Sequence, residues 1–200
     1  MSDLVHTASG RVRVDYHHFL VLDPQGPVSE EELDLSHTGL IALSDGQAEI
    51  HAGIHSGYAG VTVATHLGAP DADSGPWEEI VEVSVHAPSG ELLVSALMDD
   101  MEEELPSLAA AGPGEYRLRV HARGRDTAVD LTTQDITEHY LIQSWPAPSA
   151  PLQLLCTSDN YGAEQRSAAA PSTPVTSSRP RGQSAREHDI LHRSLHNDES

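Results

Sequence analysis

The sequence predicts an all-β protein, an antiparallel β-sandwich of jelly-roll-like type, and three observations lead to this fold class. Short segments rich in β-branched and aromatic residues alternate apolar with polar positions, as half-buried strands do. Turn sequences that contain glycine or proline separate these segments at spacings of about ten residues. Helical periodicity is almost absent from the same stretch, so we expect seven or more short strands in two packed sheets.

The strongest strand signal lies between residues 114 and 146, where we expect two long strands joined by a polar loop. The first strand has an apolar face of Tyr116, Leu118, Val120 and Ala122 and a basic face of Arg117, Arg119, His121 and Arg123. The second covers 139–145 and ends at Pro146, because proline donates no ladder hydrogen bond. The basic face could bind an anion, but we expect it to pair across the sheet with Glu78, Glu82 or Glu102–Glu104.

Further strands are expected on both sides of this pair, at 39–43, 48–52, 58–67, 77–86, 91–98 and 152–156. Residues 1–9 are interpreted as a frayed lead-in. The alternating run 11–22 is interpreted as one strand with Val12, Val14, Tyr16, His18, Leu20 and Leu22 on one side. Asp45-Gly46 between two apolar runs predicts a hairpin.

One folded domain is expected over residues 1–161. The segment 167–186 consists mainly of Ala, Pro, Ser and Thr and has no apolar periodicity. Such a composition offers too little apolar surface to offset the entropy of ordering the chain. We therefore expect residues 162–200 to form a disordered tail.

The charge of the chain is strongly one-sided. The sequence contains 31 Asp and Glu against 11 Lys and Arg, all of them Arg, and its formal net charge is −20. Such a field repels nucleic acid and anionic membranes and attracts a basic protein partner. The densest acidic block is our candidate partner-binding site: Asp99, Asp100, Glu102, Glu103 and Glu104. Genome composition or adaptation to high salt would explain the acidity without a partner.

The sequence gives no sign of catalysis or of a cofactor. It contains neither a Gly-x-Ser-x-Gly motif nor a phosphate-binding glycine loop, and Cys156 lies beyond the last clear strand. Asp99 and Asp100 are adjacent, whereas catalytic carboxylates usually come from separate strands. We therefore expect a binding protein rather than an enzyme.

The 13 histidines raise the question of a metal site. His51 and His55 stand four residues apart, and His188, His192 and His196 repeat at the same interval in the expected tail. Metal sites on β-sandwiches usually show a His-x-His pair, whose alternate residues share one face of a strand, and this sequence has none. We therefore expect no bound metal.

Cysteine content and the N-terminal residues indicate a cytoplasmic location. The single Cys156 cannot form an internal disulfide, and the start of the sequence lacks the basic and apolar regions of a signal peptide. No apolar run approaches the roughly 18 to 20 residues that cross a bilayer, so no membrane association is expected.

Two blocks resemble the competence protein J family, inhibitors of the competence DNA-entry nuclease. They are 12–19, which reads Val-Arg-Val-Asp-Tyr-His-His-Phe, and 90–120, with its strand, Met-containing acidic bend, Leu-Pro and Gly-x-Tyr strand entry. The resemblance covers about residues 11–145 and implies a small β-sandwich that binds a nuclease and has no catalysis of its own. Two alternatives remain open: a cupin-like β-sandwich enzyme or small-ligand-binding module, and a structural or interaction protein with another partner.

Overall fold

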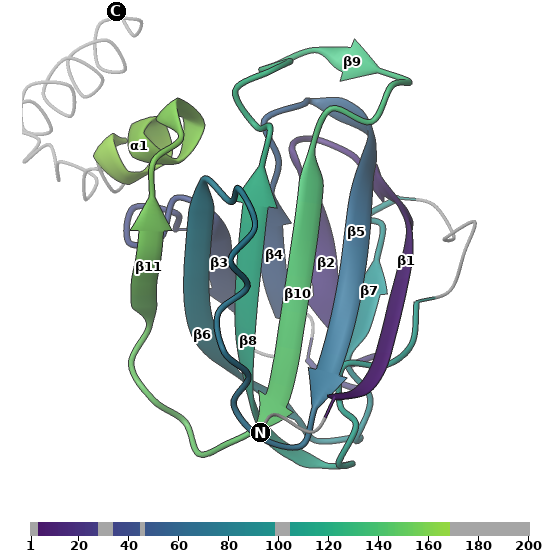
Figure 1. Cartoon of the computed structure of the whole chain (residues 1–200). Coiled ribbons are helices and arrows are strands. Elements are labelled where there is room, and N and C mark those ends of the chain that lie inside the picture. Colours follow the sequence, from purple (N-terminus) through teal and green to yellow (C-terminus); the bar gives the residue numbers. More distant parts are fainter. Residues whose placement is uncertain (1–3, 28–33, 45–46, 99–104, 169–200) are drawn as a thin grey trace, which may run out of the picture. The chain divides into compact units, whose positions relative to one another are not determined.

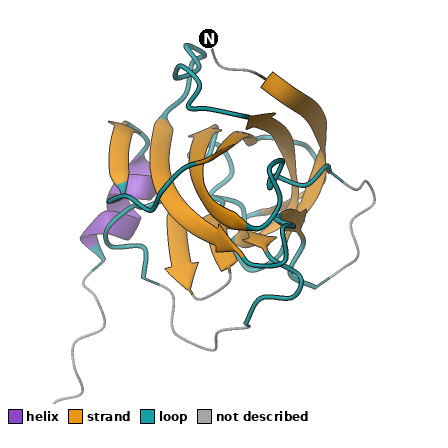
Figure 2. Cartoon of the chain, turned by 90° about the horizontal axis from the view of Figure 1, so that it is seen from below, coloured by secondary structure: helices purple, strands orange, loops and turns teal. Residues whose placement is uncertain are grey.

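The computed structural model describes residues 4–27, 34–44, 47–98 and 105–168, which form two β-sheets packed face to face (Figures 1 and 2). The larger sheet has the order β1 (Leu4–Val14), β5 (Ser56–His66), β10 (His139–Pro146), β8 (Gly114–Arg123), β6 (Glu79–Ala87) and β11 (Gln153–Thr157), with β9 (Thr132–Thr133) beside β5. The smaller sheet has the order β3 (Ile41–Ser44), β4 (Gln47–His51), β2 (His18–Leu22) and β7 (Leu93–Ser95). The predicted all-β sandwich is confirmed.

The predicted long strand pair lies at the centre of the larger sheet as β8 and β10. The two strands are antiparallel, in a register that runs from His139 opposite Arg123 to Pro146 opposite Tyr116. The apolar face of β8 is buried in the core between the sheets, with Leu118 and Val120 fully inaccessible. One neighbour departs from the expected antiparallel pattern, because β10 runs parallel to β5. A parallel pair requires a long crossover, and here β6, β7, β8 and β9 lie between its two strands in the sequence.

The expected single strand over 11–22 is wrong, because a tight turn divides it between the two sheets. Asp15 and His18 exchange backbone hydrogen bonds, and the two residues between them, Tyr16 and His17, have φ angles of 51° and 70°. Two-residue turns with positive φ usually contain Gly, Asn or Asp, so the sequence lacks the usual turn signal. The turn shifts the alternation by one residue, and Phe19 joins the core while its neighbour His18 does not.

The expectation that residues 1–9 form a frayed lead-in is also wrong over the described part. From Leu4 onward these residues belong to β1, which pairs with β5 along its whole length. The side chains of Ser9 and Thr62 share a hydrogen bond across this pair. Pairing with a long central strand therefore orders a segment whose own composition gives only a weak strand signal.

One short helix, α1 (Asn160–Ser167), follows β11 and is anchored by a buried ion pair. The Arg125 guanidinium donates two hydrogen bonds, of 2.7 and 3.0 Å, to the carboxylate of Asp159, the N-cap residue of α1. Gly162 packs against this pair, and a Cβ atom there would lie 2.6 Å from an Asp159 oxygen and 2.7 Å from an Arg125 nitrogen. A side chain at position 162 would therefore have to displace a member of this ion pair.

The helix carries the described chain beyond the domain boundary predicted at residue 161. In its last turn Arg166 donates hydrogen bonds of 2.9 and 3.1 Å to the buried carboxylate of Glu79 on β6. Residues 162–168, assigned above to the tail, therefore lie against the sandwich, and the predicted disorder of 169–200 falls outside the described residues. Within the described segments, no helix is long and apolar enough to cross a membrane.

We predict that Arg125→Met lowers the free energy of unfolding by about 3–5 kcal/mol, because it leaves the Asp159 carboxylate buried without its counter-charge. Urea denaturation of the full chain measures the change. Glu115→Gln is the control, because Glu115 pairs with His86 on the exposed surface, where an ion pair contributes less than about 1 kcal/mol. Equal losses in the two variants would contradict the anchoring role of Arg125.

Candidate functional site

Two arginines of the basic face of β8 are neutralised inside the sheet. Glu82 on β6 lies between two arginines: one oxygen accepts from Arg117 at 2.9 Å and the other from Arg119 at 3.1 Å. Both guanidinium groups are buried, and carbonyl oxygens of Pro70 and Ala150 take further donors. The predicted pairing with Glu82 is confirmed. The partly buried Glu78 does not join it, and accepts instead from the backbone N–H of Gly124.

The other arginines of the described segments also contact acidic or aromatic side chains. Two bind Asp159 and Glu79, as described above, and the others lie over rings: Arg123 over Trp77, and Arg11 and Arg13 over Tyr58. Among the described arginines, Arg11 alone falls in the exposed class. Many described carboxylates are exposed: Asp34, Asp71, Asp73, Glu91, Glu115, Asp126, Asp130, Asp135 and Glu164. These arginines therefore stabilise the fold, and the surface of the described segments presents mainly negative charge.

The predicted partner-binding residues, Asp99, Asp100, Glu102, Glu103 and Glu104, lie outside the described residues. The segments on either side are described. Before the block, Leu97 and Met98 follow the edge strand β7 and expose 37% and 67% of their surface. After it, Leu105 is buried in the core. The acidic block is therefore bordered by exposed apolar side chains on one side and by a core anchor on the other.

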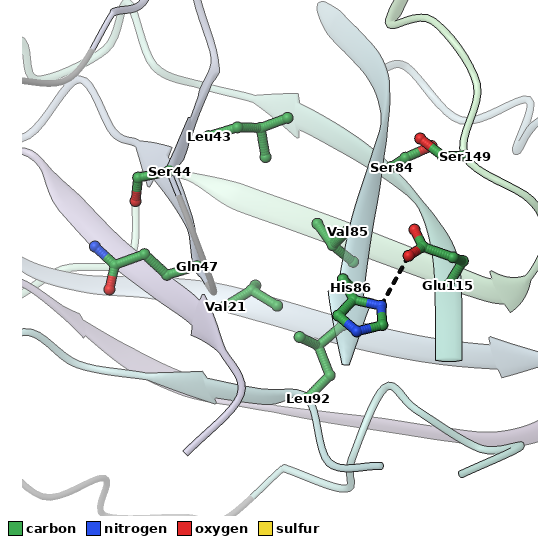
Figure 3. Close-up of a pocket in the computed structure, with 10 residues that line it drawn as sticks. All are labelled: Val21, Leu43, Ser44, Gln47, Ser84, Val85, His86, Leu92, Glu115 and Ser149. Carbon is green, nitrogen blue, oxygen red and sulfur yellow. Dashed lines mark ion pairs between the residues drawn. The ribbon is translucent and has the colours of Figure 1, made fainter. Parts of the chain in front are cut away.

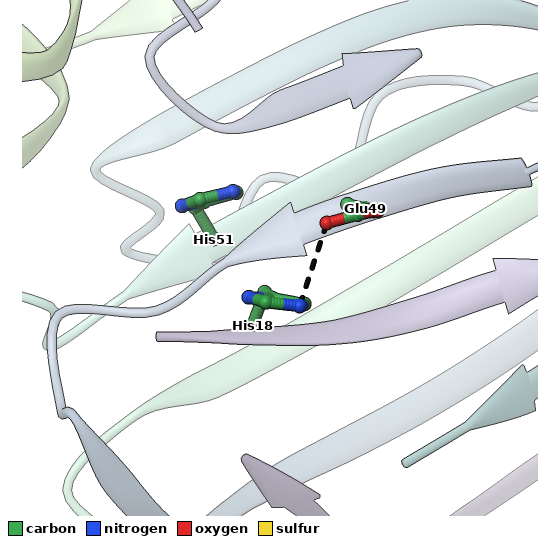
Figure 4. A group of neighbouring side chains, drawn as sticks. All are labelled: His18, Glu49 and His51. Carbon is green, nitrogen blue, oxygen red and sulfur yellow. Dashed lines mark ion pairs between the residues drawn. The ribbon is translucent and has the colours of Figure 1, made fainter. Parts of the chain in front are cut away.

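A second group of titratable side chains lies on one face of the smaller sheet: His18, Glu49 and His51 (Figure 4). Glu49 and His51 are alternate residues of β4, so they point to the same side. His18 on β2 lies directly opposite His51 in the antiparallel register, which places it on that side too. One ligand atom from each residue lies within 4.8 Å of the other two.

Hydrogen bonds orient two of these three side chains. His18 Nδ1 lies 2.9 Å from the Tyr16 carbonyl oxygen, which can only accept, so Nδ1 carries the proton and Nε2 faces Glu49 Oε2 at 3.5 Å. The Gln47 amide donates to Glu49 Oε1 at 2.9 Å. Glu49 Oε2 and His51 Nε2 are buried and have no hydrogen-bond partner among the described residues. Unpartnered buried polar atoms are rare in proteins and require an explanation.

The electrostatics of this cluster favour a neutral His51. Burial, followed by the positive charges of His18, Arg125 and His17, lowers the pKa of His51 from 6.5 to about 3. Burial also raises the pKa of the Glu49 carboxyl, against the opposing effect of His18. Two imidazoles and one carboxylate make a donor set that binds divalent transition metals.

The sequence analysis missed this cluster because it searched for His-x-His on a single strand. The structure instead combines Glu49-x-His51 on β4 with a histidine of the neighbouring strand. Of the pair considered from spacing, His51 belongs to the group and His55 does not, because the His55 ring packs against Tyr16 and His17. A search for Glu-x-His opposite a histidine would have found the cluster once the register was known.

A hollow at the edge between the sheets is a weaker candidate (Figure 3). Its volume is about 200 Å³, below the range of about 300–1,000 Å³ in which small-molecule sites fall. The ion pair within it, His86 with Glu115 at 2.8 Å, joins two exposed side chains. The hollow therefore gives no support to a ligand-binding module.

We predict that acid destabilises the metal-free protein partly through His51. Below pH 6.5 the unfolded chain protonates this histidine, whereas the folded chain does so only near its lowered pKa of about 3, so folding stability falls between these values. The slope reaches at most about 1.4 kcal/mol per pH unit for one proton. Urea denaturation from pH 7 to about 5, with a chelator present, should show a shallower decline for His51→Gln. His37→Gln, at an exposed site, should keep the full slope, and equal slopes in all three proteins would contradict the prediction.

Comparisons with known proteins give a weak structural resemblance. No protein-family model and no curated protein sequence matches the chain. ComJ from Bacillus subtilis, described as an inhibitor of the DNA-degrading activity of NucA, is similar with a TM-score of 0.48 and 16% identity over 74% of this chain and 99% of that one. The crocagin biosynthetic gene J product is similar with a TM-score of 0.46 and 15% identity over 70% of this chain and 97% of that one. The structure is thus weakly similar to ComJ, and the sequence analysis noted a weak resemblance to the same family, competence protein J.

Proposed function

We propose that the protein is a non-catalytic acidic binding protein whose partner is a basic protein. The observation that carries this proposal is the unequal placement of charge. In the described segments the arginines contact acidic or aromatic side chains, and all of them except Arg11 are at least partly buried, while many carboxylates are exposed. The chain has a formal net charge of −20, and in its described segments the exposed charge is mainly negative.

A surface of this kind selects its partners by electrostatics. It attracts cationic proteins over distances comparable to the Debye length, about 8 Å at physiological salt, and it repels DNA, RNA and anionic lipid. Complementary charge mainly accelerates association and excludes wrong partners. The absence of any recognised catalytic motif in the sequence agrees with a protein that acts by binding.

In its specific form the proposal names a nuclease as the partner, with the complex formed in the cytoplasm. A nuclease that grips DNA has a basic cleft, and an acidic surface can occupy this cleft in place of the phosphates. The same partner follows from the resemblance to competence protein J, which rests on residues 12–19 and 90–120. ComJ is described as an inhibitor of the DNA-degrading activity of NucA. We propose the corresponding activity, inhibition of a nuclease, for this chain.

The block Asp99, Asp100, Glu102, Glu103 and Glu104 is the proposed contact surface. It combines the densest charge of the chain with the exposed apolar side chains Leu97 and Met98 just before it. Charge brings a basic partner to the surface, and burial of apolar area then holds it there. The alternative of a cupin-like module is favoured by one observation, the cluster of His18, Glu49 and His51.

We predict that converting the five acids of this block to Asn or Gln slows association with the captured partner at least about tenfold at low salt. The matched control converts five exposed acids elsewhere: Asp34, Asp71, Glu91, Asp135 and Glu164. Each set of changes reduces the formal net charge from −20 to −15. The control should keep most of its association rate, because its charges lie outside the proposed contact. Stopped-flow or surface-based kinetics at low and high salt measure both variants.

The partner for these measurements comes from a pull-down with the immobilised full chain in a lysate of the source organism. A captured basic nuclease would support the specific proposal, and a captured basic protein of another class would support only the general one. Equal rates and equal salt dependence for the two variants would remove the acidic block from the interface. Acids that serve only solubility would leave affinity unchanged and lower the solubility limit.

A further inference from the structure

We infer that His18, Glu49 and His51 form a zinc site that joins β2 to β4. The ligand atoms would be His18 Nε2, Glu49 Oε2 and a ring nitrogen of His51, from three side chains that lie on the same side of the sheet (Figure 4). Two histidines and one glutamate are an established ligand set for zinc. This inference is independent of the acidic surface and of the partner proposed above.

The surroundings of the cluster are those of a metal site. Metal-bound histidines usually donate their second ring N–H to a carbonyl or carboxylate, which fixes the tautomer and the ring orientation. His18 does so through Nδ1 to the Tyr16 carbonyl, so its Nε2 lone pair is directed at the cluster. Gln47 holds the other oxygen of Glu49 and leaves Oε2 for the ion.

A simple ion pair between His18 and Glu49 does not explain the whole arrangement. This pair leaves His51 Nε2 buried and without a hydrogen-bond partner among the described residues. Glu49, on the same face of β4, is itself only 6% exposed. A neutral imidazole and a carboxylate oxygen that both lack donors are ready to donate electron pairs to a cation. An ion between them satisfies both atoms at once.

The distances require a small closure of the side chains. Tetrahedral zinc with bonds of about 2.0–2.1 Å places its ligand atoms about 3.3 Å apart. The separation of 3.5 Å between His18 Nε2 and Glu49 Oε2 already meets this value, while the widest separation in the group is within 4.8 Å. Closure of the site would therefore require a rotation of the third side chain, His51, whose ring Nε2 has no hydrogen-bond partner among the described residues.

One of the three residues borders an open hollow, and the site would have a free coordination position. His51 lines this hollow of about 300 Å³ together with His17, Asp130 and Tyr161. Three protein ligands leave the fourth position of tetrahedral zinc to water or to a group of a bound molecule. The bound ion would tie the end of β4 to the start of β2.

The test uses the untagged full chain with His188, His192 and His196 changed to Gln, because their four-residue spacing offers a second place for zinc. After metal removal and exposure to zinc, elemental analysis and titration calorimetry should find one ion per chain. In this background Glu49→Gln and His51→Gln should each weaken zinc binding at least about tenfold. His86→Gln, which alters the exposed His86–Glu115 pair, should leave the affinity unchanged.

A measurement without variants of the cluster guards against loss of folding. Proton–nitrogen NMR spectra of the histidine rings should show zinc shifting the ring-nitrogen signals of His18 and His51 and not those of His86.

Zinc should also raise the melting temperature of the parent chain but not that of Glu49→Gln. The absence of stoichiometric zinc, or binding that persists in Glu49→Gln, or shifts confined to other histidines, would overturn the inference.

Discussion

One end of the sandwich depends on the buried ion pair between Arg125 and Asp159. A desolvated positive charge must be paired, and Arg125 binds Asp159 through two hydrogen bonds while donating to the backbone carbonyls of Gly39 and His51. This one side chain therefore fixes the N-terminus of α1, the approach to β3 and the end of β4. It also contributes, after burial and His18, to the lowered pKa of His51. The position and the neutral state of a cluster residue thus depend in part on the pair that anchors the helix.

The pairing of positive charge inside the fold also affects the charge at the surface. The chain has few arginines and no lysine, and its described segments place their arginines against carboxylates and aromatic rings. Little positive charge is therefore left for the surface of these segments. Glu82 illustrates this use, because a single carboxylate neutralises both Arg117 and Arg119 across neighbouring strands. Internal pairing stabilises the sheet and leaves the outer field negative. The proposed recognition of a basic partner is therefore a consequence of how the fold uses its cations.

The sequence was sufficient for features that follow from local periodicity. The alternation in β8 predicted its buried face and its pairing with Glu82, and the fold class followed from such strands and their turns. Features set by tertiary context were missed. The turn at Tyr16 and His17 has no glycine or asparagine, and the parallel neighbour of β10 arises from a crossover that no local pattern records. The cluster of His18, Glu49 and His51 depends on a cross-strand register, and the helix anchor depends on a contact between residues 34 apart.

The central claim is that the acidic surface takes the place of nucleic acid on a basic partner. Steady-state DNA cleavage by the captured nuclease, measured over a range of DNA concentrations with and without this protein, tests it most directly. Competition for one cleft predicts that the protein raises the KM for DNA, leaves kcat unchanged and loses its effect as salt screens the charges. A lowered kcat at an unchanged KM, or cleavage that does not respond to the protein at low salt, would contradict the account.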